Sequence, residues 1–377
     1  MHKICIWTPL NTHLQSSFHD AIIKANKLDL QVCYFKKIPH ERLELGWENK
    51  EQTKIFEKNI YTIEDALLSV PDFKERTHII SGNGYAFTKK LIDYCIANQL
   101  SWIIWVERSG IQLFNTLGQN SILFNMIYPI YRKLHNRNFA KKIDKHAAGF
   151  FASGIIAEED YFQRGVSKSK IKHLYYALKP LVRSNIVPEK LKNHQFKRNF
   201  IYVGSLNQRK AIDILLKAVS KLDNSWGLIL VGKDSDDDYY QEMAENLKIH
   251  DKVLFTGAIN IKDINQYLSF SDVFILPSRF DGWGAVLNEA ASLGMPLIST
   301  HECGGAHHLI NNNENGYRVK ANSVQELYIA MNRYIKNDKL VASHGAKSNK
   351  LFQEFTVEAS AERLFKNLFE LNIIKGS

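Results

Sequence analysis

Short apolar runs alternate with amphipathic segments along the first half of the chain. Apolar residues that recur every three or four positions predict helices between these runs, as in Phe18–Ala25 and Phe87–Ala97. The runs themselves have the length of buried strands. Strands are predicted at Lys3–Thr8, Asp29–Phe35, His78–Ser81, Trp102–Val106, Gly149–Ala152 and Ile171–Leu174.

The same alternation begins again in the second half of the chain. Strands are predicted at Phe200–Val203, Leu228–Val231, Val253–Phe255, Val273–Leu276 and Leu297–Ser299, and helices at Ala211–Leu222, Tyr239–Leu247 and Gly284–Leu293. Strands and helices that alternate at this spacing are typical of βαβ units in a parallel sheet. Because the pattern occurs twice, the sequence predicts an α/β protein with two doubly wound, Rossmann-like domains.

The boundary between the two domains is expected between Leu178 and Arg198, where Pro180 and Pro188 fall in a stretch with little helical periodicity. We therefore predict an N-terminal domain over residues 1–178 and a C-terminal domain over residues 195–347. A helical pattern returns at Ser348–Leu371, after the last predicted strand. We expect this segment to pack back on the first domain.

Composition narrows the class of protein. The chain has 377 residues, 45% of them hydrophobic, which suffices for two buried cores and excludes a disordered or fibrous protein. The formal charge of +10 favours anionic partners, but no nucleic-acid motif is present and nucleic acid is disfavoured. The four cysteines form no C-x-x-C pair, as expected for reduced thiols. With no apolar leader after the N-terminus and no run of about 18 apolar residues, we expect a cytoplasmic protein.

The first candidate ligand loop follows the predicted strand Phe200–Val203. The strand ends in Gly204, a polar loop follows, and a helix begins near Ala211. Ligands of open parallel sheets bind at the carboxyl ends of strands. Arg209 and Lys210 would then lie beside a helix N-terminus, which is a favourable place for a diphosphate. Taken alone, the segment fits an exposed basic pair in an ordinary loop equally well.

The second candidate loop follows the predicted strand Val273–Leu276 and leads into a helix. Gly282 and Gly284 would let a ligand approach the backbone closely. The first free backbone N–H groups of the helix, near Ala285, Val286 and Leu287, would favour a phosphate. Asp281 precedes the helix and Glu289 follows eight residues later, so the pair could contact two parts of one ligand. Taken singly, an acid at a helix start and a surface Glu are the plainer interpretations.

Together these loops resemble the donor-binding domain of the retaining glycosyltransferases of family 4, which have the GT-B fold of two Rossmann-like domains facing a central cleft. The family has an acid, seven residues and a Glu, and DGWGAVLNE matches with Asp281 and Glu289. It also has a strand, Gly, a short loop and Lys, and VGSLNQRKAIDILLKA matches with Lys210. The stretch KVLFTGAINIKDINQYLSFSDVFILPS resembles the nucleotide-contact loop and the next strand. The resemblance is strong over Phe200–Lys320 and limited to element order over Met1–Leu178.

The resemblance implies a role for each matched residue. Glu289 would hydrogen-bond the nucleotide ribose, and Asp281 would touch hydroxyls of the donor sugar. Lys210, helped by Arg209, would neutralise the leaving diphosphate. The implied donor contacts are Gly204, Ser205, Arg209, Lys210, Gly232, Lys233, Ile259, Asp281, Gly282, Trp283, Gly284, Ala285, Val286, Leu287 and Glu289. The family needs no metal, so no cofactor is expected beyond the UDP- or GDP-linked sugar that serves as co-substrate.

Three positions depart from the family pattern. The first acid is usually Glu but is Asp281 here, one methylene shorter. Ser205 replaces an Arg that often follows the first Gly of the loop, and Arg209 could supply the missing charge. Ala211 stands where the family usually has Gly after the Lys. These changes bear on the fine geometry of donor binding rather than on the class of donor.

The acceptor is expected to bind to the N-terminal domain. Asn11 and His13 lie in the loop after the first predicted strand, and Asn83 lies in a second loop, SGNGY. Glu107 and Arg108 follow another strand, and Glu107 is a candidate catalytic base on the acceptor side. A solvated loop histidine and a loop ion pair are the plain alternatives.

Residues Ile122–His146 begin with apolar and aromatic side chains and end with basic ones. Such a segment suits an anionic membrane surface, which would make the protein a peripheral membrane protein on the inner face of the cell membrane. A core-packing helix with a solvated basic face fits equally well.

The sequence therefore predicts a retaining, metal-independent glycosyltransferase. It would move a sugar from a nucleotide-diphosphate donor to a glycan or polyprenol-linked acceptor, as in lipopolysaccharide or capsule biosynthesis. A nucleotide-sugar epimerase of the same fold and a non-catalytic sugar-nucleotide-binding protein are the alternatives.

Overall fold

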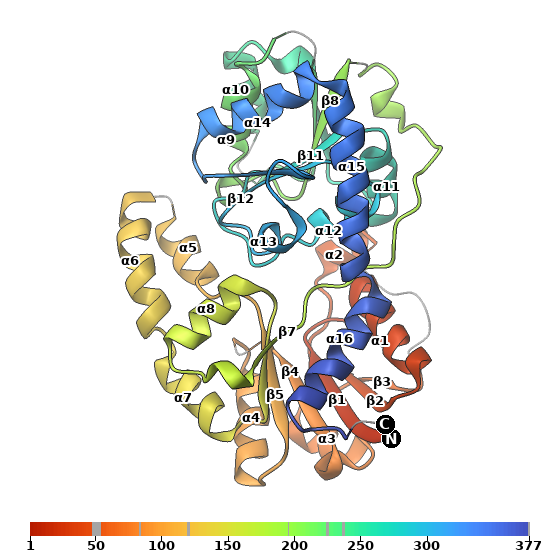
Figure 1. Ribbon diagram of the computed structural model, residues 1–377, viewed down its shortest axis with the longest axis vertical. Helices are drawn as coiled ribbons and strands as arrows, with labels where there is room; N and C mark the ends of the chain where they lie inside the picture. The colour runs from red at the N-terminus through yellow and green to blue at the C-terminus, as the bar shows by residue number, and fades with distance from the viewer. Residues whose placement is uncertain are drawn as a thin grey trace. The chain divides into compact units, whose positions relative to one another are not determined.

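The computed structural model describes residues 1–46, 54–82, 84–118, 121–194, 196–223, 226–235 and 238–375. They form two compact units, each built around a parallel sheet with helices on both faces (Figure 1). The first unit contains Met1–Gly110, Met126–Lys179 and Phe355–Ser377, and the second contains Ile111–Asn125 and Pro180–Glu354. The predicted α/β class with two Rossmann-like domains is confirmed.

In the described part of the first unit, seven parallel strands stand in the order β3-β2-β1-β4-β5-β6-β7. They are β1 (His2–Thr8), β2 (Leu28–Tyr34), β3 (Glu57–Asn59), β4 (Thr77–Ser81), β5 (Trp102–Val106), β6 (Gly149–Ala152) and β7 (Ile171–His173). The helices are α1 (His13–Ala25), α2 (His40–Glu44), α3 (Ile63–Ser69), α4 (Ala86–Ala97), α7 (Arg137–His146), α8 (Ile155–Gln163) and α16 (Val357–Glu370). Helix α6 (Ser121–Leu134) begins in the second unit and ends in the first.

Six parallel strands form the described sheet of the second unit, in the order β10-β9-β8-β11-β12-β13. They are β8 (Arg198–Val203), β9 (Trp226–Val231), β10 (Val253–Gly257), β11 (Val273–Leu276), β12 (Leu297–Thr300) and β13 (Gly316–Val319). Its helices are α5 (Ile111–Leu117), α9 (Ile212–Val219), α10 (Tyr239–Asn246), α11 (Ile261–Ser269), α12 (Val286–Ser292), α13 (Ala306–Leu309), α14 (Val324–Lys336) and α15 (Asp338–Phe352).

Helix α16 belongs to the first unit although it follows the second sheet in the sequence. It lies beside α1, where Leu364 and Leu368 join the core that Ile6 and Phe18 form on one face of the sheet (Figure 1). The Lys27 ammonium group also pairs with the Glu362 carboxylate at 2.9 Å. The chain thus returns to its first sheet at its end.

Several element boundaries differ from the sequence prediction. The edge strands β3 and β13 were not predicted, since β3 is Glu-Lys-Asn and β13 contains Arg318, so neither forms an apolar run. Helix α12 begins at Val286 rather than at Gly284. The segment predicted as helical over Ser348–Leu371 is interrupted because the Thr356 hydroxyl caps a new helix, accepting from the Ala359 amide at 3.2 Å.

Candidate active site

The order in which strands are added to the second sheet reverses between β8 and β11. β8 pairs with β9 on one side and with β11 on the other, so successive strands are added first toward one edge and then toward the opposite one. Ligands of open α/β sheets bind at such a switch point, beside the carboxyl ends of the strands. The loops after β8 and β11 carry the predicted basic pair and the predicted acid, so the topology brings these residues together.

The loop after β8 ends in a short 3₁₀ turn, Gln208–Lys210. Asn207 caps the turn because its side-chain oxygen accepts from the Lys210 amide at 3.0 Å. The next residue, Ala211, has a φ of 57°, a left-handed conformation that costs a residue with a Cβ about 1–2 kcal/mol. This backbone conformation explains why the family pattern has glycine at the position of Ala211.

An ion pair joins the two loops at the switch point. Lys210 Nζ contacts Asp281 Oδ2 at hydrogen-bonding distance, and Arg209 Nη1 lies 3.9 Å from the same oxygen. Burial alone would raise the pKa of Asp281, but Lys210, Arg209 and the Ser278 hydroxyl together lower it below the usual value. Asp281 is therefore ionised at neutral pH and neutralises Lys210 when no donor is bound.

Arg279, which the sequence patterns did not predict as a site residue, also connects these loops. Arg279 forms a two-pronged pair with Asp213 in α9, at 2.8 and 2.7 Å. Its amide also donates to the Arg209 carbonyl at 2.8 Å. Such forked arginine–carboxylate contacts fix geometry as well as charge. An arginine in the loop after a predicted strand was the available signal, but it did not reveal the partner.

Glu289 lies in the first turn of α12 and is partly buried. Within the described part of the chain, no hydrogen bond or ion pair reaches its carboxylate. Burial raises the pKa of Glu289 to about 7. An uncompensated acid of this kind is typical of a functional site, where a ligand supplies the missing partners.

The remaining predicted donor residues divide into backbone and core positions. Gly204 and Gly232 directly follow β8 and β9, and a Cβ on Gly232 would lie 1.9 Å from the Gly204 oxygen. Gly284 has a φ of 81°, and a Cβ there would lie 2.7 Å from the Cys303 sulfur. Beside this loop, Gly282, Ala285 and Val286 are partly buried, as is Ile259 after β10, whereas Ser205 and Lys233 are exposed.

Two of the predicted donor contacts, Trp283 and Leu287, are buried inside the second unit. Trp283 is buried, and its indole N–H donates to Asn288 Oδ1 at 2.8 Å. Leu287 is also buried. The expectation that the Leu287 amide is free was wrong, because it donates to the Gly284 carbonyl at 2.9 Å in the turn that opens α12.

The predicted acceptor-side residues lie in the first unit. The Tyr176 hydroxyl donates to the Glu107 carboxylate, and Arg108 is buried with Nη2 2.7 Å from the Tyr128 hydroxyl of α6. Asn11 is partly buried, and its side-chain oxygen has no hydrogen-bond partner among the described residues. His13 begins α1, but its side chain lies outside the described residues, as does the whole of Asn83.

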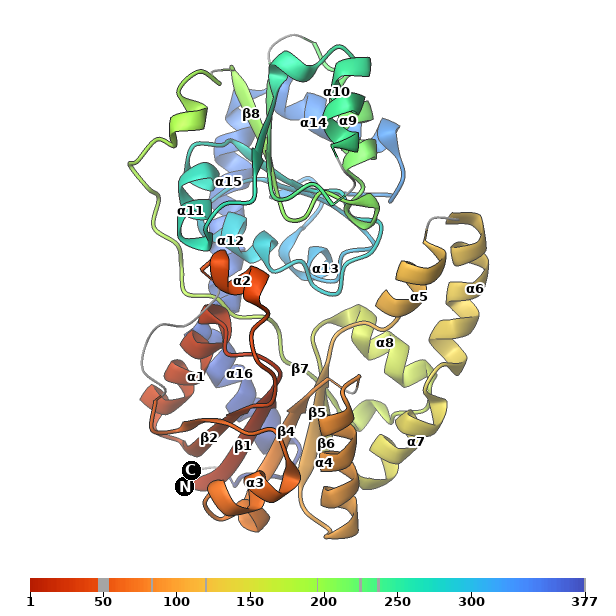
Figure 2. The same ribbon diagram turned by 180° about the vertical axis from the view of Figure 1, so that it is seen from behind.

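The segment predicted to meet a membrane, Ile122–His146, forms α6 and α7 (Figure 2). Four apolar side chains spaced four residues apart lie along one side of α6 and are 58–74% exposed: Ile122, Met126, Ile130 and Leu134. Lys133 at the end of α6 and Arg137, Lys141 and Lys145 in α7 are exposed cations. None of the described helices is long and apolar enough to cross a membrane.

Part of this segment instead packs inward. Arg132 Nε contacts the buried carboxylate of Asp160 in α8, and Arg132 Nη2 lies 3.3 Å from Glu159. Phe124 and Tyr128 are buried. The inward-facing side of α6 is therefore structural, and only its outer side and the exposed cations of α7 remain available to a surface.

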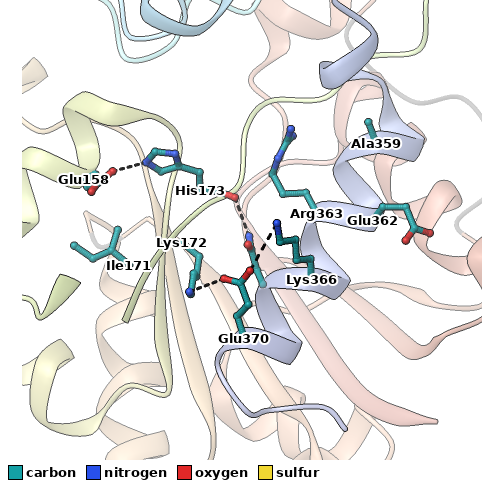
Figure 3. A pocket seen from close by; sticks show the side chains of 10 residues that line it. Glu158, Ile171, Lys172, His173, Ala359, Glu362, Arg363, Lys366 and Glu370 are labelled. Atoms are coloured by element: carbon teal, nitrogen blue, oxygen red, sulfur yellow. Dashed lines mark hydrogen bonds and ion pairs between the residues drawn. The ribbon is translucent and has the colours of Figure 1, made fainter. Parts of the chain in front are cut away.

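An open groove of about 600 Å³ lies in the first unit between β7, α8 and α16 (Figure 3). Two pairs of its polar side chains contact each other: Lys172 lies 2.6 Å from Glu370, and His173 Nε2 lies 2.6 Å from Glu158. Asn367 donates to the His173 carbonyl at 2.8 Å. These contacts attach α16 to the edge strand β7, so we interpret the groove as part of that packing.

The described part of the chain contains neither a cluster of metal-binding side chains nor a disulfide. Among the described residues, no three His, Cys, Asp or Glu side chains gather as ligands of a metal ion. The four cysteines are free and buried. Cys5 and Cys33 are neighbours with sulfurs 3.7 Å apart, and burial raises the pKa of Cys5.

Comparison with known proteins shows which family has a sequence similar to these loops. Residues 184–350 match the family model described as "Glycosyl transferases group 1". This stretch includes the Lys210–Asp281 pair and Glu289. Over this stretch, which is less than half of the chain, the sequence is similar to the group 1 glycosyltransferases.

Individual relatives are distant. An uncharacterized glycosyltransferase of Haemophilus influenzae is 24% identical over 287 residues, covering 74% of this chain and 79% of that one. The lipopolysaccharide 1,6-galactosyltransferase of Escherichia coli is 26% identical over 52% of this chain and 53% of its own length. The chain thus aligns with only about half of that enzyme.

Solved structures share the fold over nearly the whole chain. Anabaena Alr3699/HepE, crystallised in complex with UDP-glucose, has a TM-score of 0.71 and covers 97% of this chain and 99% of its own, at 16% identity. The neighbours are GT-B glycosyltransferases, so the GT-B fold expected from the sequence is confirmed.

Proposed function

We propose that this chain transfers a sugar, with retention of anomeric configuration, from a nucleoside-diphosphate sugar to a glycan or lipid-linked glycan. The observation that carries the proposal is the meeting of Lys210, Arg209 and Asp281 at the switch point of the second sheet. Glu289 supplies a carboxylate without a protein partner in the same unit. Two cations for a diphosphate and two acids for hydroxyl groups match the chemistry of such a donor.

Lys210 changes partner during the proposed reaction. When the bond between the anomeric carbon and the diphosphate oxygen breaks, the electron pair stays on that oxygen, and negative charge develops on the leaving group. Lys210 then pairs with the diphosphate, helped by Arg209, while Asp281 accepts hydrogen bonds from the sugar hydroxyls. Glu289 accepts from the ribose hydroxyls.

On the acceptor side, the attacking hydroxyl loses its proton as the new glycosidic bond forms. Glu107 is the candidate base in the first unit, with its orientation set by the Tyr176 hydroxyl. A lipopolysaccharide galactosyltransferase among the relatives supports a surface-glycan acceptor, and a UDP-glucose complex among the structural neighbours supports a UDP-linked donor. The reaction belongs in the cytoplasm, where nucleotide sugars are supplied.

Acceptor-free hydrolysis of nucleotide sugars tests this proposal directly. We expect one UDP- or GDP-linked sugar to raise the melting temperature and to be hydrolysed slowly, because water can replace the acceptor. Hydrolysis should continue in EDTA, since Lys210 and Arg209 supply the positive charge that a metal would supply elsewhere. Loss of activity in EDTA with recovery in magnesium or manganese would contradict the metal-free mechanism. Release of an epimerised nucleotide sugar would favour the epimerase instead.

We also propose that the outer side of α6, with Lys133, Arg137 and Lys141, binds an anionic membrane surface. Apolar side chains on one side of a helix and nearby cations are the features of an interfacial helix. Each cation near such a surface contributes about 1 kcal/mol, and salt screens this attraction over about 8 Å at physiological ionic strength.

Binding to vesicles is therefore expected to require anionic lipid and to weaken with salt. The variant Met126→Gln/Ile130→Gln/Lys133→Glu/Lys141→Glu should bind far less than the wild type. Arg132 is left unchanged because it pairs with buried Asp160. A control variant, Lys89→Glu/Lys90→Glu in α4, changes charge by the same amount at exposed positions elsewhere. Equal binding by the α6–α7 variant and the wild type would exclude this surface.

A further inference from the structure

One segment from the first half of the sequence belongs structurally to the second unit. Residues Ile111–Asn125, which contain α5 and the first turn of α6, group with Pro180–Glu354 rather than with the strands that precede and follow them. The segment follows β5 directly after Glu107 and Arg108. The second unit therefore includes residues from the range 1–178, which was predicted to form the N-terminal, acceptor-binding domain.

The segment contacts the second unit through three phenylalanine rings. Phe114 of α5 and Phe124 of α6 lie 5.7 and 6.2 Å from Phe280, measured between ring centroids. The two rings of the segment are 5.1 Å apart and nearly perpendicular, at 75°. All three side chains are buried. These distances are those of attractive aromatic pairs.

Phe280 is the residue through which this cluster reaches the donor site. Its carbonyl oxygen accepts from Arg209 Nη1 at 3.0 Å. The next residue is Asp281, whose carboxylate holds Lys210. The peptide group between Phe280 and Asp281 thus contains the carbonyl oxygen that accepts from Arg209 and the amide nitrogen of Asp281. The buried Phe280 ring holds this peptide group in place.

We propose that Phe114 and Phe124 are positioning residues for the donor site, acting through Phe280 to fix where Arg209, Lys210 and Asp281 lie. The role of these charges in transfer rests on the proposed function, whereas the positioning itself does not. Without the two rings, Phe280 can turn into the vacated volume, and the following peptide moves with it. A displacement of about 1 Å in a group that stabilises a transition state can cost up to about 10²-fold in rate.

This arrangement makes a specific kinetic prediction. Phe114→Leu and Phe124→Leu should each lower kcat for acceptor-free hydrolysis about tenfold, because the leaving-group cations are misplaced. The KM for the donor should change less than about twofold, because Glu289, which is expected to hold the ribose, is carried by α12 and not by the anchored peptide. Phe114→Tyr keeps the ring and should retain wild-type kcat.

A core substitution elsewhere serves as the matched control. Phe150→Leu removes a fully buried ring that packs on Tyr161 in the first unit. It should lower the melting temperature without changing kcat, provided that rates are measured well below that temperature. If Phe150→Leu lowers kcat as much as Phe114→Leu, or if both leucine variants near Phe280 keep wild-type kcat, the positioning role is wrong.

A second measurement separates failure of this inference from failure of the proposed function. Acylation of lysines in the intact, ligand-free protein, followed by digestion and mass spectrometry of the peptides, gives the labelling rate of Lys210 and reports how firmly Asp281 holds it. We expect the leucine variants to raise the labelling rate of Lys210 several-fold relative to exposed Lys133, and Phe150→Leu to leave it unchanged. Unchanged labelling in Phe114→Leu and Phe124→Leu overturns the inference. Raised labelling in a protein that hydrolyses no nucleotide sugar supports the inference and rejects the function.

Discussion

Lys210→Ala is expected to lower kcat for donor hydrolysis by about 10²–10³-fold, because it removes a cation placed against charge that develops on the leaving diphosphate. The same change leaves the buried Asp281 carboxylate without its main partner. Removal of one partner of a buried ion pair costs about 3–5 kcal/mol, although Arg209 and Ser278 will offset part of this loss. Both kcat and the free energy of unfolding should therefore fall.

A double variant distinguishes the two losses. Lys210→Ala/Asp281→Asn removes the unpaired charge, so it should regain much of the stability while kcat stays low. The measurements are urea unfolding of the free protein and hydrolysis at saturating donor. Should Lys210→Ala hydrolyse the donor at the wild-type rate under saturation, Lys210 has no part in the mechanism.

Glu289→Gln is expected to change binding and stability in opposite directions. Nucleotide affinity should fall about 10²-fold, because the carboxylate that would accept from the ribose hydroxyls is lost. The ligand-free protein should become more stable at pH 8, by at most about 3 kcal/mol. The reason is that burial raises the pKa of Glu289 from 4.5 to about 7.

The sign of this stability change follows from proton binding. Between pH 4.5 and about 7 the folded protein holds a proton on Glu289 that the unfolded chain has released, so stability falls as the pH rises through this window. The change to glutamine removes that dependence. Unfolding experiments at pH 5 and pH 8 measure it, with Glu242→Gln, an exposed position in α10, as the control. If Glu289→Gln binds nucleotide as tightly as the wild type, Glu289 does not belong to the donor site.

The sequence predicted the parts of the fold whose pattern is local. Apolar runs predicted most strands of both sheets, including the edge strands β7 and β10, whereas β3 and β13 were missed because β3 is Glu-Lys-Asn and Arg318 interrupts the apolar pattern of β13. The two donor loops were recognisable because glycines, acids and bases stand at fixed spacing after buried strands. The left-handed backbone at Ala211 was not predictable, because alanine gives no sign of it.

Long-range partners were beyond the reach of local patterns. The pairing of Arg279 with Asp213 and of Arg132 with Asp160 joins residues from separate elements, and nothing near either arginine indicates its partner. Arg108 illustrates the same limit, since its burial and its contact with Tyr128 could not be predicted from its position after a strand. Contacts of this kind are set by the packing of helices, which the periodicity of one segment does not specify.

The Lys210–Asp281 pair also affects which anions can bind to the two cations. Small anions such as inorganic phosphate compete for every exposed cation of a protein. With Asp281 in place, the two cations Arg209 and Lys210 are reduced to a single net positive charge, so a lone small anion has little to gain by displacing the carboxylate. A nucleotide sugar offers a diphosphate to the cations and hydroxyl groups to the released acid at the same time. We therefore expect the pair to exclude small anions and to open for a ligand that contacts both the cations and the acid.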